Sequence, residues 1–129
     1  MPRLASVYAK MLGEKISKHN TSVYLINTGW AGGPYGVGKR IKIEYSRAMV
    51  TAVINGSLDI VKFSHNDLFN LDVPTECPGV PSEVLEPRNT WVDKDAYDLS
   101  AKKLAQMFVD NFKKFKDASE EISSAGPKL

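Results

Sequence analysis

The chain has 129 residues, with 17 lysines and arginines against 15 aspartates and glutamates, and 43% of it is apolar. These values are typical of one globular domain and exclude a disordered chain. A formal net charge of +2 gives little attraction for phosphate backbones, so we expect no nucleic-acid partner. No apolar run approaches the roughly 20 residues of a membrane helix, and no leader-like segment precedes residue 20. We therefore expect a cytoplasmic protein with no membrane partner.

The residue types that bind metals are few. Cys77 is the single cysteine, and neither His19 nor His65 lies at a spacing typical of a zinc site. We therefore predict no metal site. One cysteine also cannot close an internal disulfide, which favours a reducing compartment.

The first third of the chain predicts a helix, a strand and a loop. Apolar residues at steps of three and four predict an amphipathic helix over residues 5–18. The partly β-branched run 22–28 predicts a buried strand. Five glycines fall between Gly29 and Gly38, and glycine loses the most backbone freedom on ordering, so this stretch predicts a loop.

The middle of the chain predicts a strand followed by a helix. Residues 40–45 alternate polar and apolar side chains, which is typical of a half-buried strand. Ser46 then predicts the start of a helix over 47–54, and Asn55-Gly56 predicts its end.

The last part of the chain predicts short strands and one long helix. We expect the strands around 61–63 and 68–71, and an irregular strap over 74–87, which contains four prolines. An apolar stripe predicts a helix over Asp93–Lys116, and the sparse apolar anchors of 117–129 predict a flexible tail. The fold class predicted is mixed α/β, with short strands and a long C-terminal helix.

The segment Gly33–Arg40 nearly fits the phosphate-binding P-loop pattern of Gly, four residues, Gly, Lys and then Ser or Thr. However, Arg40 stands where a hydroxyl would bind magnesium, and Pro34 has no N–H to offer a phosphate. The expected strand also replaces the helix that the motif requires. We therefore favour a connection between two strands over a phosphate cradle.

Arg40 and Ser46 still indicate a nucleotide contact. A planar guanidinium can stack on a purine, and a hydroxyl in the first turn of a helix lies beside free N–H groups. Two alternatives stay open, because surface arginines are usually only solvated and a serine at this place can be only a helix cap.

Several further motifs occur in a fixed order and resemble those of the C-terminal part of ATP-dependent phosphoenolpyruvate carboxykinases. The resemblance covers nearly the whole chain, from about Ser6 to Leu129. The matching motifs are Tyr24–Trp30, Gly36–Ile41, Ser46–Ala48, Asn55–Leu58, Val73–Val80, Leu85–Thr90 and Ala125–Leu129.

This resemblance implies a fold, a reaction and three site residues. The fold is an incomplete C-terminal subdomain, with residues 1–129 forming one segment on the nucleotide side. The family converts oxaloacetate and ATP to phosphoenolpyruvate, CO2 and ADP in gluconeogenesis, using magnesium with the nucleotide and a second metal, typically manganese. Carried over by position, Arg40 would stack on adenine and Ile41 would contribute backbone and an apolar wall. Ser46 would supply the hydroxyl that the family usually takes from threonine.

The family's P-loop, metal ligands and oxaloacetate-binding arginine lie upstream of this segment. We therefore expect no catalytic residue here, no activity of the chain alone, and two partners: ATP or ADP, and the missing N-terminal part of the enzyme. Two alternatives stay open. In the first alternative, the chain is a stand-alone, non-catalytic nucleotide-binding or scaffold module. In the second, it is a truncated product without a function of its own.

Overall fold

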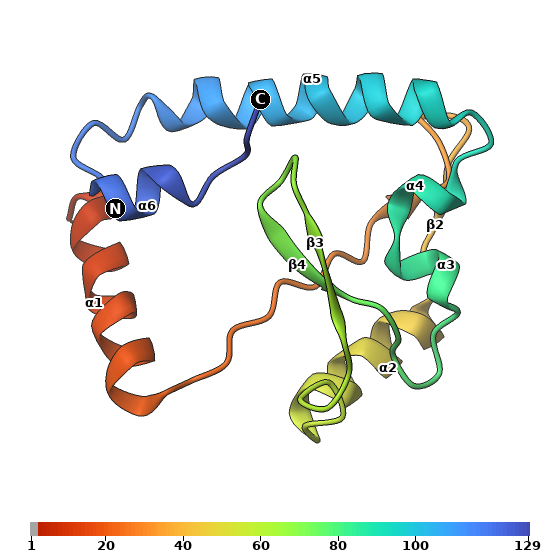
Figure 1. Ribbon diagram of the computed structural model, residues 1–129, viewed down its shortest axis with the longest axis horizontal. Helices are drawn as coiled ribbons and strands as arrows, with labels where there is room; N and C mark the ends of the chain where they lie inside the picture. The colour runs from red at the N-terminus through yellow and green to blue at the C-terminus, as the bar shows by residue number, and fades with distance from the viewer. Residues whose placement is uncertain (1–2) are drawn as a thin grey trace.

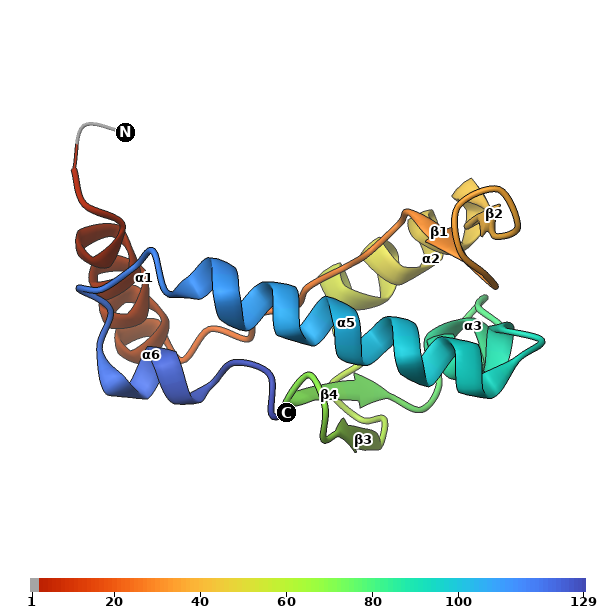
Figure 2. The ribbon, with the colours of Figure 1, turned by 90° about the horizontal axis from the view of Figure 1, so that it is seen from above.

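The computed structural model describes residues 3–129. In Figure 1, α5 crosses the top of the molecule, α1 descends at one side, and the β3–β4 hairpin lies between them and α2. Figure 2 shows that α1 and the β1–β2 hairpin lie at opposite ends of the molecule. In chain order the elements are α1 (Ala5–His19), β1 (Trp30–Ala31), β2 (Lys39–Arg40), α2 (Ile43–Ile54), β3 (Phe63–Asn66), β4 (Leu71–Pro74), α3 (Ser82–Leu85), α4 (Pro87–Thr90), α5 (Lys94–Phe112) and α6 (Glu120–Ser124).

Helix α1 confirms the helix predicted over 5–18. It ends at His19, and the left-handed backbone of its C-cap residue Asn20 (φ 47°) lets the Thr21 N–H donate to the carbonyl of Ile16 at 3.1 Å. The strand predicted over 22–28 is wrong, because this segment is extended chain without ladder partners. Its Val23 and Leu25 are 68% and 87% exposed. A β-branched run becomes a strand only when another strand pairs with it, and none lies beside this one among residues 3–129.

The strand predicted over 40–45 is also wrong, since β2 ends at Arg40 and α2 begins at Ile43. The apolar residues that alternate in 40–45 are too few to distinguish the period of a strand from that of a helix. Tyr45, Met49 and Ala52, at steps of four and three, all pack into one cluster, which is the period that the chain follows. The predicted helix start at Ser46 is therefore wrong, because Lys42 is the N-cap residue and Ser46 lies at the end of the first turn of α2. The predicted end is confirmed, with Asn55 as the C-cap residue.

The β3–β4 hairpin is antiparallel, with Phe63 opposite Pro74 and Asn66 opposite Leu71. Two short strands were predicted here, and both are present two to three residues later than expected. The irregular strap predicted over 74–87 is present only up to residue 81, because the short helices α3 and α4 follow it.

Helix α5 is the longest element, and its predicted start is confirmed. The Asp93 side chain caps it by accepting a hydrogen bond from the Ala96 N–H at 2.9 Å. The helix ends at Phe112, so the predicted extension to residue 116 is wrong. Neither α5 nor any other helix in residues 3–129 combines the length and apolar content that a membrane crossing requires.

The residues after α5 form another short helix, α6, and then return to the β3–β4 turn. The Lys128 N–H donates to the carbonyl of Leu68 at 2.9 Å, and the Asn70 amide donates to the carbonyl of Ala125 at 3.0 Å. The flexibility expected for 117–129 stays a prediction.

The core is small and lies between α2 and the strap. Its buried members are Ala52, Leu58, Cys77 and Val80. On α5, Ala101 and Ala105 are buried as well. The predicted mixed α/β class is confirmed, with antiparallel pairs of short strands among the helices.

Candidate functional site

The loop of the β1–β2 hairpin uses its own N–H groups to close a tight turn. Val37 and Gly38 both donate to the carbonyl of Pro34, at 3.0 and 2.9 Å. A Cβ at Gly38 would lie 2.6 Å from the carbonyl oxygen of Gly33, so glycine is needed there for steric reasons. Since these N–H groups have partners within the loop, the geometry favours a connection between strands over a phosphate cradle.

Arg40 ends β2 directly opposite Trp30 of β1. Pairing continues one residue further, where the Ile41 N–H donates to the carbonyl of Gly29 at 2.9 Å. The Arg40 side chain is exposed, and Ile41 is half-buried. Among residues 3–129, the Arg40 guanidinium takes part in no hydrogen bond or ion pair, so its planar face and its donors are available to a ligand.

Ser46 lies one helical turn into α2 and is half-buried. Its N–H donates to the carbonyl of Lys42 at 3.2 Å, and its hydroxyl lies 3.5 Å from the same oxygen. This second distance is long for a hydrogen bond, so the hydroxyl can turn to a better partner. No hydrogen bond within residues 3–129 links Arg40, Ile41 and Ser46 through their side chains, although all three lie on the short path from β2 into α2.

Lys42 is the cation between Arg40 and Ser46, and it is already engaged. Its ammonium lies 3.4 Å from Glu44 and 5.3 Å from the centre of the Tyr45 ring. The Glu44 carboxylate raises the pKa of Lys42, so the charge of Lys42 is stabilised locally. Arg40 is therefore the better candidate for an incoming planar group.

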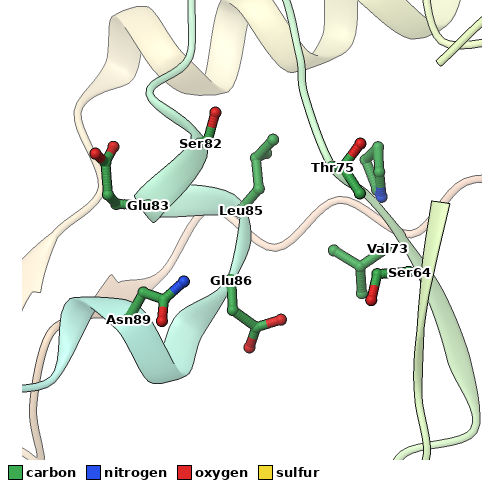
Figure 3. A pocket seen from close by; sticks show the side chains of 9 residues that line it. Ser64, Val73, Thr75, Ser82, Glu83, Leu85, Glu86 and Asn89 are labelled. Carbon is green, nitrogen blue, oxygen red and sulfur yellow. The ribbon is translucent and has the colours of Figure 1, made fainter. Parts of the chain in front are cut away.

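Sequence reasoning did not find two shallow cavities that flank the β3–β4 hairpin. The first, about 320 Å³, lies between this hairpin and α3–α4, with Ser64, Thr75, Glu86 and Asn89 among its lining side chains (Figure 3). The hydroxyl of Thr75 is already used, because it donates to the carbonyl of Lys62 at 3.0 Å. These residues come from segments far apart along the chain, and no local motif indicates that they meet.

The second cavity, about 360 Å³, is bordered by an ion pair between α4 and α5. The Arg88 guanidinium donates to both carboxylate oxygens of Asp98, at 2.8 and 3.0 Å. This contact holds the pKa of Asp98 below its ordinary value. Since Arg88 and Asp98 neutralise each other, this pair serves to connect the two helices.

The described residues do not supply a ligand set for magnesium or manganese. Nowhere in residues 3–129 do three or more His, Cys, Asp or Glu side chains gather as metal ligands would. His65 and Asp72 meet across the β3–β4 hairpin at 2.8 Å, but this pair has no third member. The expectation that metal ligands lie elsewhere stays a prediction.

Comparison with known proteins decides the family. The model of the phosphoenolpyruvate carboxykinase family matches residues 1–83. The chain belongs to the phosphoenolpyruvate carboxykinase (ATP) family. The predicted resemblance is thereby confirmed, and Arg40, Ile41 and Ser46 all lie inside the matched stretch.

The family's curated members match almost all of this chain but only part of their own length. Phosphoenolpyruvate carboxykinase (ATP) of Caldanaerobacter subterraneus subsp. tengcongensis is 61% identical over 128 residues, which are 99% of this chain and 25% of the relative. The enzyme of the same name from Fusobacterium nucleatum is 60% identical, with 99% and 25% covered. Phosphoenolpyruvate carboxykinase (ATP) 2 of Moorella thermoacetica is 57% identical, with 98% and 24% covered. The chain thus spans about a quarter of the length of these relatives.

Proposed function

We propose that this chain forms the adenine-side wall of the ATP site in a phosphoenolpyruvate carboxykinase. Arg40 stacks on the base, Ile41 adds an apolar wall and Ser46 offers its hydroxyl. The observation that carries this proposal is the exposed guanidinium of Arg40 at the end of β2, which has no partner among residues 3–129 and lies inside the stretch matched to the family. A planar cation held by a hairpin, with a helix beginning three residues later, suits a flat, electron-rich base.

The reaction proposed for the whole enzyme is the conversion of oxaloacetate and ATP to phosphoenolpyruvate, CO2 and ADP. Gluconeogenesis in the cytoplasm is the setting that the resemblance implies, with magnesium and manganese as the metals. Phosphoryl transfer depends on positioning and on charge neutralisation by metal ions and cations. The residues described here offer a base-binding wall, so we propose that the chain alone is inactive and that the phosphate and metal groups come from the rest of the enzyme.

The partner proposed for this chain is therefore the remaining three quarters of the enzyme. Two helical faces support this proposal, because they expose large apolar side chains that a finished fold would cover. On α1, Met11 and Leu12 are 49% and 61% exposed, and on α5, Met107 and Phe108 are 59% and 53% exposed.

A hybrid enzyme tests the proposal. In it, the matching quarter of the Caldanaerobacter relative is replaced by this chain, and phosphoenolpyruvate formation is measured. We expect an active hybrid in which Arg40→Ala raises the KM for ATP by about tenfold, the value of one lost cation–π or stacking contact with partial burial. The KM for oxaloacetate should stay unchanged.

Arg47→Ala is the matched control, because Arg47 is also an exposed arginine near the start of α2 but has no place in the proposed site. An equal rise of the ATP KM in both variants would contradict a specific role for Arg40. An unchanged KM for ATP in Arg40→Ala would exclude the proposed adenine contact.

The second candidate is a stand-alone nucleotide-binding module, favoured by the small core that α2 forms with residues of this chain alone. It requires saturable ATP binding by the 129-residue chain, weakened by Arg40→Ala. Isothermal calorimetry that detects no heat at millimolar ATP would exclude it.

A further inference from the structure

The two tryptophans of the chain have different surroundings. Trp91 packs edge-on against Tyr97, with ring centres 5.7 Å apart, and is half-buried. Trp30 has no aromatic partner among residues 3–129 and is 63% exposed. Exposure of a large amphipathic ring on a short hairpin is unusual, because indole rings usually bury most of their area.

The strand register places Trp30 beside Arg40. The two residues are direct partners in the antiparallel pair β1–β2, so their side chains project from the same face of the hairpin. The next pair, Gly29 and Ile41, is joined by a hydrogen bond. Hydrogen-bonded and non-hydrogen-bonded pairs alternate in such ladders, so Trp30 and Arg40 form a non-hydrogen-bonded pair, in which side chains come closest.

The neighbours of Trp30 leave its ring accessible. Side chains alternate between the two faces of a strand, so the neighbours on the side of the indole are Thr28 and Gly32, and neither has a bulky side chain. The only cation–π contact within residues 3–129 is that of Lys42 with Tyr45, so the Arg40 guanidinium does not cover the indole either. An indole and a guanidinium thus share one hairpin face, both planar and both uncovered.

We infer that Trp30 is a second base-contacting residue, which stacks on the purine of ATP beside Arg40. This inference rests on the proposed function. An aromatic ring binds a base through stacking and dispersion, which do not depend on the phosphates. Trp30 therefore determines affinity for the base, whereas the triphosphate is held by other parts of the enzyme.

The hybrid enzyme defined above tests this inference with Trp30→Leu, which keeps an apolar side chain but removes the ring. The KM for ATP should rise about five- to a hundredfold, the range for loss of one base–aromatic stack. The inhibition constant of inorganic tripolyphosphate, which has no base, should not change. Trp30→Phe should recover most of the affinity, because phenylalanine also offers a ring face. Trp91→Leu is the matched control and should leave the KM for ATP unchanged.

Each other outcome has a definite meaning. If Trp30→Leu weakens ATP and tripolyphosphate equally, or if only the melting temperature falls, then Trp30 is a packing residue and the inference is wrong. If Arg40→Ala raises the KM for ATP and Trp30→Leu does not, the inference fails while the proposed function stands. If Arg40→Ala leaves the KM for ATP unchanged, the proposed function fails, and the inference that rests on it fails as well.

Discussion

Two regions of this molecule contain similar amphipathic helices, but only one of them is packed. Helix α2 buries Ala52 against Leu58, Cys77 and Val80. Helix α1 has no buried residue, although its apolar side chains follow the same helical period. The comparison shows that an apolar stripe specifies a helix and the side to be covered, whereas burial depends on a partner. For α1, that partner belongs to the polypeptide beyond these residues in our proposal.

The largest expected effect comes from the packed region. Leu58 is 4% exposed, and Leu58→Ala should lower the free energy of unfolding by about 2–5 kcal/mol, since a buried leucine leaves a cavity. Leu12 of α1 is 61% exposed, and Leu12→Ala should change this free energy by less than about 0.5 kcal/mol. Urea unfolding followed by circular dichroism measures both variants. Similar losses in the two variants would show that α1 is packed in solution after all.

The second effect concerns the hairpin that carries the candidate site. Gly38→Ala should destabilise the hairpin by about 1–3 kcal/mol, because the new Cβ would meet the Gly33 carbonyl oxygen at 2.6 Å. Gly36→Asn is the control, since the space around Gly36 is open and asparagine tolerates its positive φ of 87°. Hydrogen exchange of the Ile41 amide reports on the hairpin. Equal exchange rates in both variants would contradict the steric argument.

A smaller effect of opposite sign should come from α1. Gly13 lies inside this helix, and apart from the adjacent residues and the helix's own backbone no atom lies within 4 Å of an added Cβ. Gly13→Ala should therefore stabilise α1 by about 0.5–1 kcal/mol, because alanine loses less backbone freedom on ordering. Helical ellipticity during thermal unfolding measures the change. A decrease in stability would mean that Gly13 has a close neighbour in solution.

The smallest effect is expected at the half-exposed pair between α4 and α5. Arg88 lowers the pKa of Asp98 below its ordinary value, so the pair stabilises the fold above the unfolded-state pKa of this carboxyl. That contribution is lost as the pH falls through the lowered folded-state pKa. The melting temperature of Asp98→Asn should therefore be slightly below that of the unchanged chain at about pH 6, and the difference should vanish near about pH 2. A difference that persists in acid would assign the effect to something other than charge.

Local signals in the sequence predicted the elements that local physics determines. The period of α1, the Asp93 cap of α5 and the Asn55-Gly56 end of α2 were all readable, because each depends on residues within a few positions. The segment 22–28 was mispredicted as a strand because its outcome depends on a pairing partner. The segment 40–45 was mispredicted because three alternating apolar residues fit either period.

The candidate site was predictable in part. Residue chemistry indicated Arg40 and Ser46, the resemblance added Ile41 and the three roles, and these roles stay predictions. Trp30 is separated from Arg40 by nine intervening residues, and only the hairpin register shows that the two face the same side. The cavities beside β3–β4 could not be predicted from the sequence, because the residues that line them come from segments that only the tertiary fold brings together.

The burial of Cys77 has a practical consequence. Cys77 is 5% exposed, and burial raises the pKa of its thiol, so it should react slowly with alkylating reagents at neutral pH. Tyr35, at the tip of the β1–β2 loop, is fully exposed. A Tyr35→Cys variant would therefore accept a single fluorescent or spin label next to the candidate site, with the native cysteine left unmodified.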